Sequence, residues 1–287
     1  MNAAPASAAP ASAAPATAAP AAAPVARLKV TQGRVVRSEW IKFRSLRSTL
    51  YTLLVAVVLM IGIGALFSAV TASQYRTFSV AEKATFNAVS TSLTGISFAV
   101  IAFGVLGVLL MGGEYSTGMI RSSLTAVPRR LPVLWGKLAV FAGAIFSVSL
   151  VASFISFFLG QALLSGHHLS VAITAPGALR SVIGAALYVT VAGMIGVALG
   201  ALLRNTAAGI STFVGVFFVI PPLTGLLPAS VSDHLTKYLP SNAGEALWSG
   251  THGAQSSLSP WTGFALLCGY AVVLIAAAAW RLRSADA

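Results

Sequence analysis

Six long apolar runs dominate this chain and determine its fold class. They cover residues 48–70, 92–112, 133–160, 181–203, 206–227 and 260–280. Each reaches the roughly 20 residues that an α-helix needs to cross the hydrocarbon of a bilayer. Lys137 is the one charged residue within a run, and it lies near an edge. Because a charge at a helix centre costs at least ~2.5–3.5 kcal/mol, such runs are typical of membrane helices. We predict an all-α polytopic membrane protein with six transmembrane helices.

The basic residues predict the orientation of these helices. When the segments between the runs are numbered alternately inside and outside, starting inside, 14 of the 18 Lys and Arg residues fall inside. The remaining four, on the outside, are Arg76, Lys83, Arg180 and Lys237. The positive-inside rule then places both termini in the cytoplasm. We expect a multi-pass protein of the plasma membrane.

The net charge of +12 does not by itself indicate a nucleic-acid partner. Basic residues beside membrane spans set topology and contact anionic lipid headgroups, and no soluble segment is expected that could read a groove. The single cysteine, Cys268, lies within the last run and is expected to pack as a small apolar residue. Adjacent histidines such as His167 and His168 do not share one helix face, so we expect no metal site and no cofactor.

The composition divides the chain into four parts. Residues 1–26 are almost pure Ala, Pro, Ser and Thr. Such a segment cannot bury a core, and we expect a disordered cytoplasmic tail, or alternatively a docking tail. Residues 27–47 are predicted to hold an interfacial amphipathic helix, residues 48–283 the six-span membrane domain, and residues 284–287 a short cytoplasmic tail.

The predicted interfacial helix covers residues 34–47. Its apolar arc consists of Val35, Val36, Trp40, Phe43 and Leu46. Glu39 and Arg47 intrude on this arc, which weakens the amphipathic pattern. An aromatic side chain next to basic ones, here Lys42 and Arg44, is typical of a helix that lies in the membrane interface. The alternative is a solvated basic leader for the first span.

The longest outer connection, residues 228–259, contains a candidate capping box from Asn242 to Glu245. This pattern predicts a helix that starts at Asn242 and is too short to cross the membrane. Pro221 and Pro222 should kink or end the fifth helix shortly before. We therefore expect a broken helix followed by a short interfacial or re-entrant helix.

Residues 112–137 connect the second and third runs on the predicted cytoplasmic side. Glu114 stands where the second run ends, and residues 118–125 are predicted to form a short amphipathic helix. The carboxylate of Glu114 is expected to pair with Arg121 or Arg129, to pair with a basic partner surface, or to cap the short helix. The simplest alternative for the whole segment is an ordinary loop.

This segment resembles the permease subunits of type 2 ABC exporters. The shared pattern is an acidic residue, a short Gly-containing helix, Pro-Arg-Arg at residues 128–130 and a Lys at the next span, here Lys137. The leader Ser-Glu-Trp-Ile-Lys-Phe-Arg-Ser at residues 38–45 and the long outer segment between the fifth and sixth runs match as well. Each motif alone is short, so the resemblance, over roughly residues 34–283, depends on their order.

The resemblance implies a permease that forms a translocation path together with a second permease chain, identical or different. It also implies that two cytoplasmic ATPase subunits bind to this pair. Residues 34–47 and 114–130 would contact the ATPases. The positions that the resemblance indicates for coupling are Glu114, Thr117, Met119, Ile120, Arg121 and Leu124. Those that it indicates in the interfacial helix are Glu39, Trp40, Lys42, Phe43 and Arg44.

The chain contains no G-x-x-x-x-G-K-[ST] sequence, which is the loop that cradles nucleotide phosphates in P-loop ATPases. We therefore expect ATP to bind and to be hydrolysed on a partner subunit, with no catalytic residue in this chain. The sequence does not identify the transported molecule. Gly104, Gly107, Gly193 and Gly200 would serve equally well for close helix packing and for lining a path.

Two other protein classes fit six spans. A secondary transporter without an ATPase partner often carries Asp, Glu or His at mid-membrane depth. These runs have none, so such a transporter would have to couple transport to sodium ions bound by backbone carbonyl oxygens. A rhomboid-like serine protease needs a Ser and a His together inside the membrane. Ser97 and Ser211 each follow a Gly-Ile pair, but all four histidines fall in predicted outer loops.

Overall fold

The computed structural model describes residues 31–116, 130–249 and 258–284. Within these ranges the chain is helical and forms no strand. Six helical stretches are long and apolar enough to cross a membrane. The predicted all-α class and the six candidate spans are therefore confirmed.

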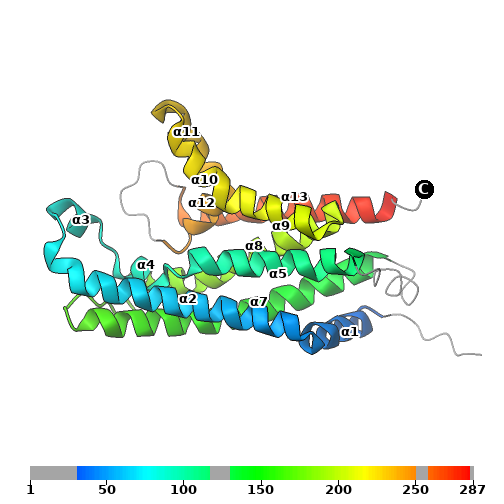
Figure 1. Cartoon of the computed structure of the whole chain (residues 1–287), viewed down its shortest axis with the longest axis horizontal. Coiled ribbons are helices and arrows are strands. Elements are labelled where there is room, and N and C mark those ends of the chain that lie inside the picture. Colours follow the sequence, from blue (N-terminus) through cyan, green and yellow to red (C-terminus); the bar gives the residue numbers. More distant parts are fainter. Residues whose placement is uncertain (1–30, 117–129, 250–257, 285–287) are drawn as a thin grey trace, which may run out of the picture. The chain divides into compact units, whose positions relative to one another are not determined.

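The bounds of the helices follow the chain in order (Figure 1). They are α1 (Gln32–Ser45), α2 (Arg47–Gln74), α3 (Val80–Thr85), α4 (Ala88–Leu93), α5 (Ile96–Ser116), α7 (Arg130–Ser165), α8 (Ala178–Leu203), α9 (Thr206–Val214), α10 (Ile220–Leu223), α11 (Ala229–Leu235), α12 (Pro240–Glu245) and α13 (Pro260–Ser284).

The helices extend beyond the apolar runs that predict them, because a helix continues until a cap or a turn ends it. The third span, for example, covers Leu131–Ser165, whereas its apolar run covers 133–160. Residues 71–91, which separate the first two apolar runs, contain α3 and the start of α4. Each is begun by a side-chain cap: the Ser79 hydroxyl accepts from the backbone N–H of Glu82, and the Asn87 carboxamide oxygen accepts from two backbone N–H groups of α4.

Helix α8 is the centre of the packed helices. It contacts α5, α7 and α13, and 72% of its apolar window is buried. Glycines let α5 and α8 approach closely: a Cβ on Gly196 would collide with the carbonyl oxygen of Gly104, and a Cβ on Gly107 would collide with that of Gly193. Small residues at helix crossings are the usual means by which membrane helices associate. These glycines therefore have a packing role.

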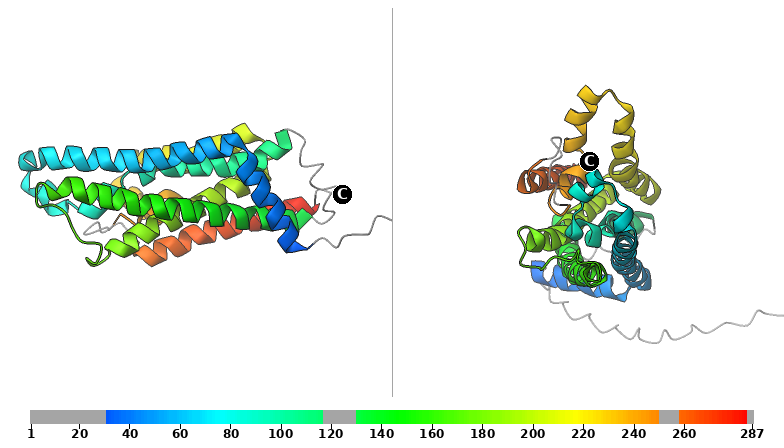
Figure 2. Two further views of the ribbon diagram at one scale, coloured as in Figure 1. Left: turned by 90° about the horizontal axis from the view of Figure 1, so that it is seen from below. Right: turned by 90° about the vertical axis from the view of Figure 1, so that its left-hand side faces the viewer.

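Helix α1 lies across one end of the other helices (Figure 2). The backbone of Leu46 is extended, and this interruption lets α1 turn away from the direction of α2. We call this end the α1 end; it also holds the start of α7 and the final turns of α5, α8 and α13 (Figure 1). The opposite end, with α4 and α12, is the α12 end.

The fifth span is irregular, as its two prolines predict. Helix α9 passes into a π-helical turn at Gly215–Val219, and Pro221 and Pro222 then lie in the first turn of α10. The first turn tolerates proline because its N–H groups have no partner within the helix. Only 17% of this span's apolar window is buried, so α9 and α10 leave much apolar surface uncovered within the described chain.

The predicted capping box at Asn242 is wrong. Helix α12 begins earlier, at Pro240, and Leu239 occupies the N-cap position without a side-chain cap. The fixed φ of proline suits the first helical turn, so Pro240 starts the helix ahead of Asn242. At 6 residues the helix is too short to cross a membrane, as expected, and Leu247 just after it is buried.

Candidate functional site

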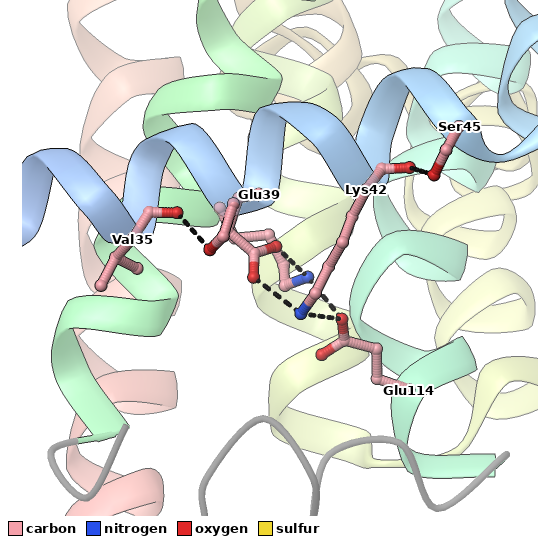
Figure 3. A network of polar contacts seen from close by, with 7 residues as sticks. Val35, Glu39, Lys42, Ser45 and Glu114 are labelled. Carbon is pink, nitrogen blue, oxygen red and sulfur yellow. Dashed lines mark hydrogen bonds and ion pairs between the residues drawn. The ribbon is translucent and has the colours of Figure 1, made fainter. Parts of the chain in front are cut away.

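Four charged side chains from three helices meet at the α1 end. Helix α1 contributes Glu39 and Lys42, the last turns of α5 contribute Glu114, and the second turn of α7 contributes Lys137. In Figure 3 the side chains of Glu39 and Lys42 extend from α1 toward Glu114. We call these four residues the ion network.

Lys137 is the centre of the ion network. Its Nζ lies 2.7 Å from Oε2 of Glu39 and 2.8 Å from Oε1 of Glu114. Lys42 Nζ lies 3.0 Å from Oε1 of Glu39 and 3.7 Å from Oε1 of Glu114. Two carboxylates and two ammonium groups give a network without net charge. Each lysine therefore joins both acids, and α1 is linked through charges to α5 and α7.

Three of the four side chains are shielded from solvent, and Lys42 is partly exposed. The exposed fraction of the side chain is 2% for Lys137, 4% for Glu39, 11% for Glu114 and 36% for Lys42. Removing charges from water is costly, and their mutual attraction offsets that cost only when the geometry is good. Loss of one partner would leave an uncompensated buried charge, which costs about 3–5 kcal/mol. The network therefore stabilises only an arrangement in which α1, α5 and α7 stay together.

The pKa of Glu39 depends on two opposing effects, burial and ion pairing. Burial raises the pKa of this carboxyl, but the charges and hydrogen bonds of Lys137 and Lys42 together outweigh burial and leave the pKa below its ordinary value. Glu39 is therefore ionised at neutral pH.

Residues at helical spacing on α1 build this contact. Val35, Glu39 and Phe43 are the buried residues of the helix and lie four apart, on one face. Gly136 on α7 lies directly under Val35, where a Cβ would be only 3.0 Å from its Cγ1. The glycine lets α1 settle onto α7 so that Glu39 reaches Lys137 one residue further along.

The structure places the predicted α1 residues in three groups: in the ion network, in the core and on the surface. Glu39 and Lys42 belong to the ion network, and Phe43 is part of the hydrophobic core. Trp40 is 46% exposed, Arg44 is exposed, and Leu46 lies beyond the end of α1. Of the predicted apolar arc, Val35 and Phe43 are buried and Val36 packs against the core, whereas Trp40 and Leu46 are exposed within the described chain.

Of the residues predicted in the cytoplasmic segment, Glu114 is described, and it pairs with Lys137 and Lys42. The others lie outside the described residues: Thr117, Met119, Ile120, Arg121 and Leu124, together with the predicted helix 118–125 and Arg129. The pairing of Glu39 with Lys137 was missed from the sequence. Two features of the sequence could have indicated the pairing: Glu39 interrupts the apolar arc of the first helix, and Lys137 interrupts an apolar run.

A cavity of about 390 Å³ opens beside the ion network. It lies between the junction of α1 with α2 and the last three turns of α5. Lys42, Glu114 and Lys137 line one part of it, and leucines of α5 line another. The arrangement combines a charged end with an apolar wall.

A further carboxyl group, Glu245, is partly buried at the α12 end, and its role was also missed from the sequence. Glu245 ends α12, which packs against α8 and α13. Burial raises the pKa of Glu245 to about 7. Its electrostatic neighbour on α8 is Tyr188, whose side chain is fully buried. Glu245 can therefore gain or lose a proton near neutral pH.

The described residues hold no group of three or more His, Cys, Asp or Glu side chains that could bind a metal ion. Comparison of the sequence with known protein families finds no family model that matches, and comparison with curated proteins finds no match.

Proposed function

We propose that this chain is the membrane-spanning permease subunit of an ATP-driven exporter of the type 2 ABC kind. It would reside in the plasma membrane with the α1 end in the cytoplasm, form the translocation path with a second permease chain, and couple to separate cytoplasmic ATPase subunits. The observation that carries this proposal is the ion network. It joins α1 to the end of α5, the two elements that the sequence resemblance assigns to ATPase contact.

The network offers a physical route for coupling. A displacement of α1 by a partner would draw Lys137 and thus α7 with it, since separation would isolate buried charges. Glu114 transmits the same displacement to α5, which packs against the central helix α8. Three helices would therefore move as one group in response to a force applied at the α1 end.

Exposed apolar surface supports the second permease chain. Only 22% of the apolar window of the first span and 17% of that of the fifth is buried within the chain. Lipid can cover both faces, but two helices with so little contact to their own chain are available for packing against another copy. Mass measurement of the purified complex would decide the number of permease chains.

The proposal is tested by isolating the chain from its native membranes in mild detergent and identifying the subunits that accompany it by mass spectrometry. We expect a soluble ABC ATPase, and ATP hydrolysis by the complex in proteoliposomes that stops when the ATPase's own P-loop lysine is replaced. A chain that exports a cargo without any nucleotide-hydrolysing partner would contradict the proposal.

Orientation is tested separately by cysteine labelling in a Cys268→Ser background. A cysteine at position 123 should react with an impermeant reagent only after the membrane is opened, whereas one at Lys83 should react in intact cells. Labelling of position 123 from outside would contradict a cytoplasmic α1 end.

Glu245 favours a second candidate function, a proton-coupled secondary transporter. A carboxyl group with a pKa near 7, packed beside a central membrane helix, is the kind of group that proton-driven carriers use. In that case an imposed pH gradient would drive transport in proteoliposomes that contain the chain alone, without ATP, and Glu245→Gln would abolish it.

A further inference from the structure

The cavity beside the ion network is graded from polar to apolar along the helices that form it. Its polar lining includes Ser48 and Thr49, in the first turn of α2, and Glu114, near the end of α5. Leu109 and Leu106 line it one to two turns deeper along α5. Both helices belong to candidate membrane spans, so the gradient runs in the direction in which a membrane lipid passes from headgroup to acyl chain.

The size of the cavity limits what can occupy it. A volume of about 390 Å³ is at the low end of the roughly 300–1,000 Å³ of small-molecule sites. It suits a lipid headgroup and the first part of one chain. The rest of the lipid would lie along the apolar surface of α2, where Val55 and Leu59 are exposed on the same helix face as Thr52 of the lining.

The charged end of the cavity has unused hydrogen-bonding capacity. Within the described part of the chain, the buried Oε2 of Glu114 has no hydrogen-bond partner, while Oε1 faces both lysines. A buried carboxylate oxygen without a donor is costly. Because the terminal torsion of a Glu side chain is soft, a small rotation presents Oε2 to the cavity, where it would accept an N–H hydrogen bond.

The charges favour a zwitterionic occupant with an N–H donor. The ion network has no net charge, so a ligand without net charge preserves the balance. An ammonium group would donate to Glu114 in a charge-assisted hydrogen bond, which is about twice as strong as a neutral one. The phosphate of the same headgroup would lie near Lys42 and Ser48 at the outer rim of the lining.

The geometry points to a binding site for an ethanolamine phospholipid in this cavity. The primary ammonium of the headgroup binds Glu114, and the start of one acyl chain packs against the leucines of α5. The occupied site joins the α1–α2 junction to α5 and so makes the position of α1 dependent on the lipid of the adjoining leaflet. This inference does not require an ATPase partner and stands independently of the proposed function.

The test compares three lipids with the same acyl chains on the purified, delipidated full-length chain, by native mass spectrometry. Phosphatidylethanolamine is expected to bind at least tenfold more tightly than phosphatidylcholine, which has the same charges but no N–H donor, and more tightly than phosphatidylglycerol, which is anionic. Equal binding of ethanolamine and choline lipids, tighter binding of the glycerol lipid, or no retained lipid would each overturn the proposal.

Variants locate the site. Leu109→Trp fills the cavity and should remove the preference for the ethanolamine lipid. Leu54→Trp, at a position on α2 that is 60% exposed and is not part of the lining, is the matched control and should keep it. Glu114→Gln keeps the shape but not the charge, and it should lower ethanolamine-lipid binding toward the choline level. An unchanged preference in Leu109→Trp, with the fold intact by circular dichroism, would show that the lipid binds elsewhere.

Discussion

Lys137 Nζ lies 2.7 Å from Oε2 of Glu39, although 98 residues separate the two in sequence. The contact closes the chain across the first two spans and ties α1, which precedes them, to the start of the third. Since both side chains are buried, α1 cannot leave α7 without exposing one charge to an apolar surface. The N-terminal helix is therefore an integral part of the helix bundle.

Lys137→Met tests the energetic role of this contact. The variant leaves Glu39 and Glu114 buried with Lys42 as their common partner, so the free energy of unfolding should fall by about 3–5 kcal/mol. Thermal unfolding in detergent measures the loss. The matched control is Arg44→Met on the exposed face of α1, which should change stability by less than about 0.5 kcal/mol.

A triple variant separates a broken network from a replaced one. Lys137→Met combined with Glu39→Gln and Glu114→Gln removes the buried charges together, and stability should recover to near that of the original chain, because apolar or neutral replacement of a buried ion cluster is often close to neutral. A triple variant that is less stable than Lys137→Met alone would contradict this account of the network.

The six spans could be predicted from the sequence because a run of about twenty apolar residues is typical of a helix that crosses a bilayer. The ion network could not, since it depends on which helix faces which. Glu39 alone weakens an amphipathic pattern and Lys137 alone weakens an apolar run; their pairing becomes visible only when α1 packs on α7. The start of α12 was mispredicted for a local reason, because Pro240 can begin a helix as well as a capping box can.

Glycine packing at the crossing of α5 and α8 can be tested with identical substitutions at two sites. Gly196→Ala would place a Cβ against the carbonyl oxygen of Gly104, and overpacking of this kind should cost about 1–3 kcal/mol. Gly143→Ala on α7 meets no atom within 4 Å and should leave stability unchanged or raise it slightly, because alanine favours a helix. Equal thermal midpoints for the two variants would mean that the close contact is not needed.

Glu245 should make stability dependent on pH near neutrality. Its pKa is about 7 in the folded chain, against an ordinary value of 4.5. Between these values the folded state holds a proton that the unfolded state has released, so the free energy of unfolding falls as the pH rises through this window. Thermal midpoints measured from pH 5 to pH 8 should fall, and Glu245→Gln should flatten the decline and be the more stable form at pH 8.

The control for this titration is Asp233→Asn, at an exposed position on α11. This variant should keep the pH profile of the original chain. If Glu245→Gln shows that same profile, other titratable groups cause the decline of the thermal midpoint. Glu245 would then not be the group that loses its proton in this pH range.

Coupling to an ATPase is tested at Glu114 and in the segment that follows it. Glu114→Ala removes one acid of the ion network, so the link between α5 and α7 is lost while Glu39 still holds Lys137 to α1. We expect nearly normal insertion and abundance, because buried Lys137 keeps Glu39 as its partner and the charge left in excess falls on Lys42, whose side chain is 36% exposed and can be hydrated. ATP hydrolysis should no longer drive export. Replacing Met119 and Ile120 together by Asp should instead weaken ATPase binding itself, since apolar contact would be lost and two carboxylates would be desolvated.

Co-purification of the ATPase and cargo-stimulated hydrolysis in reconstituted membranes distinguish the two effects. Glu114→Ala should retain the ATPase and lose the stimulation, whereas the double Asp variant should lose the ATPase. Arg44→Met again serves as the control, because it alters the charge of α1 without touching the network. Normal binding and normal export in both variants would reduce residues 114–130 to a connector and leave the ion network with a purely structural role at the α1 end.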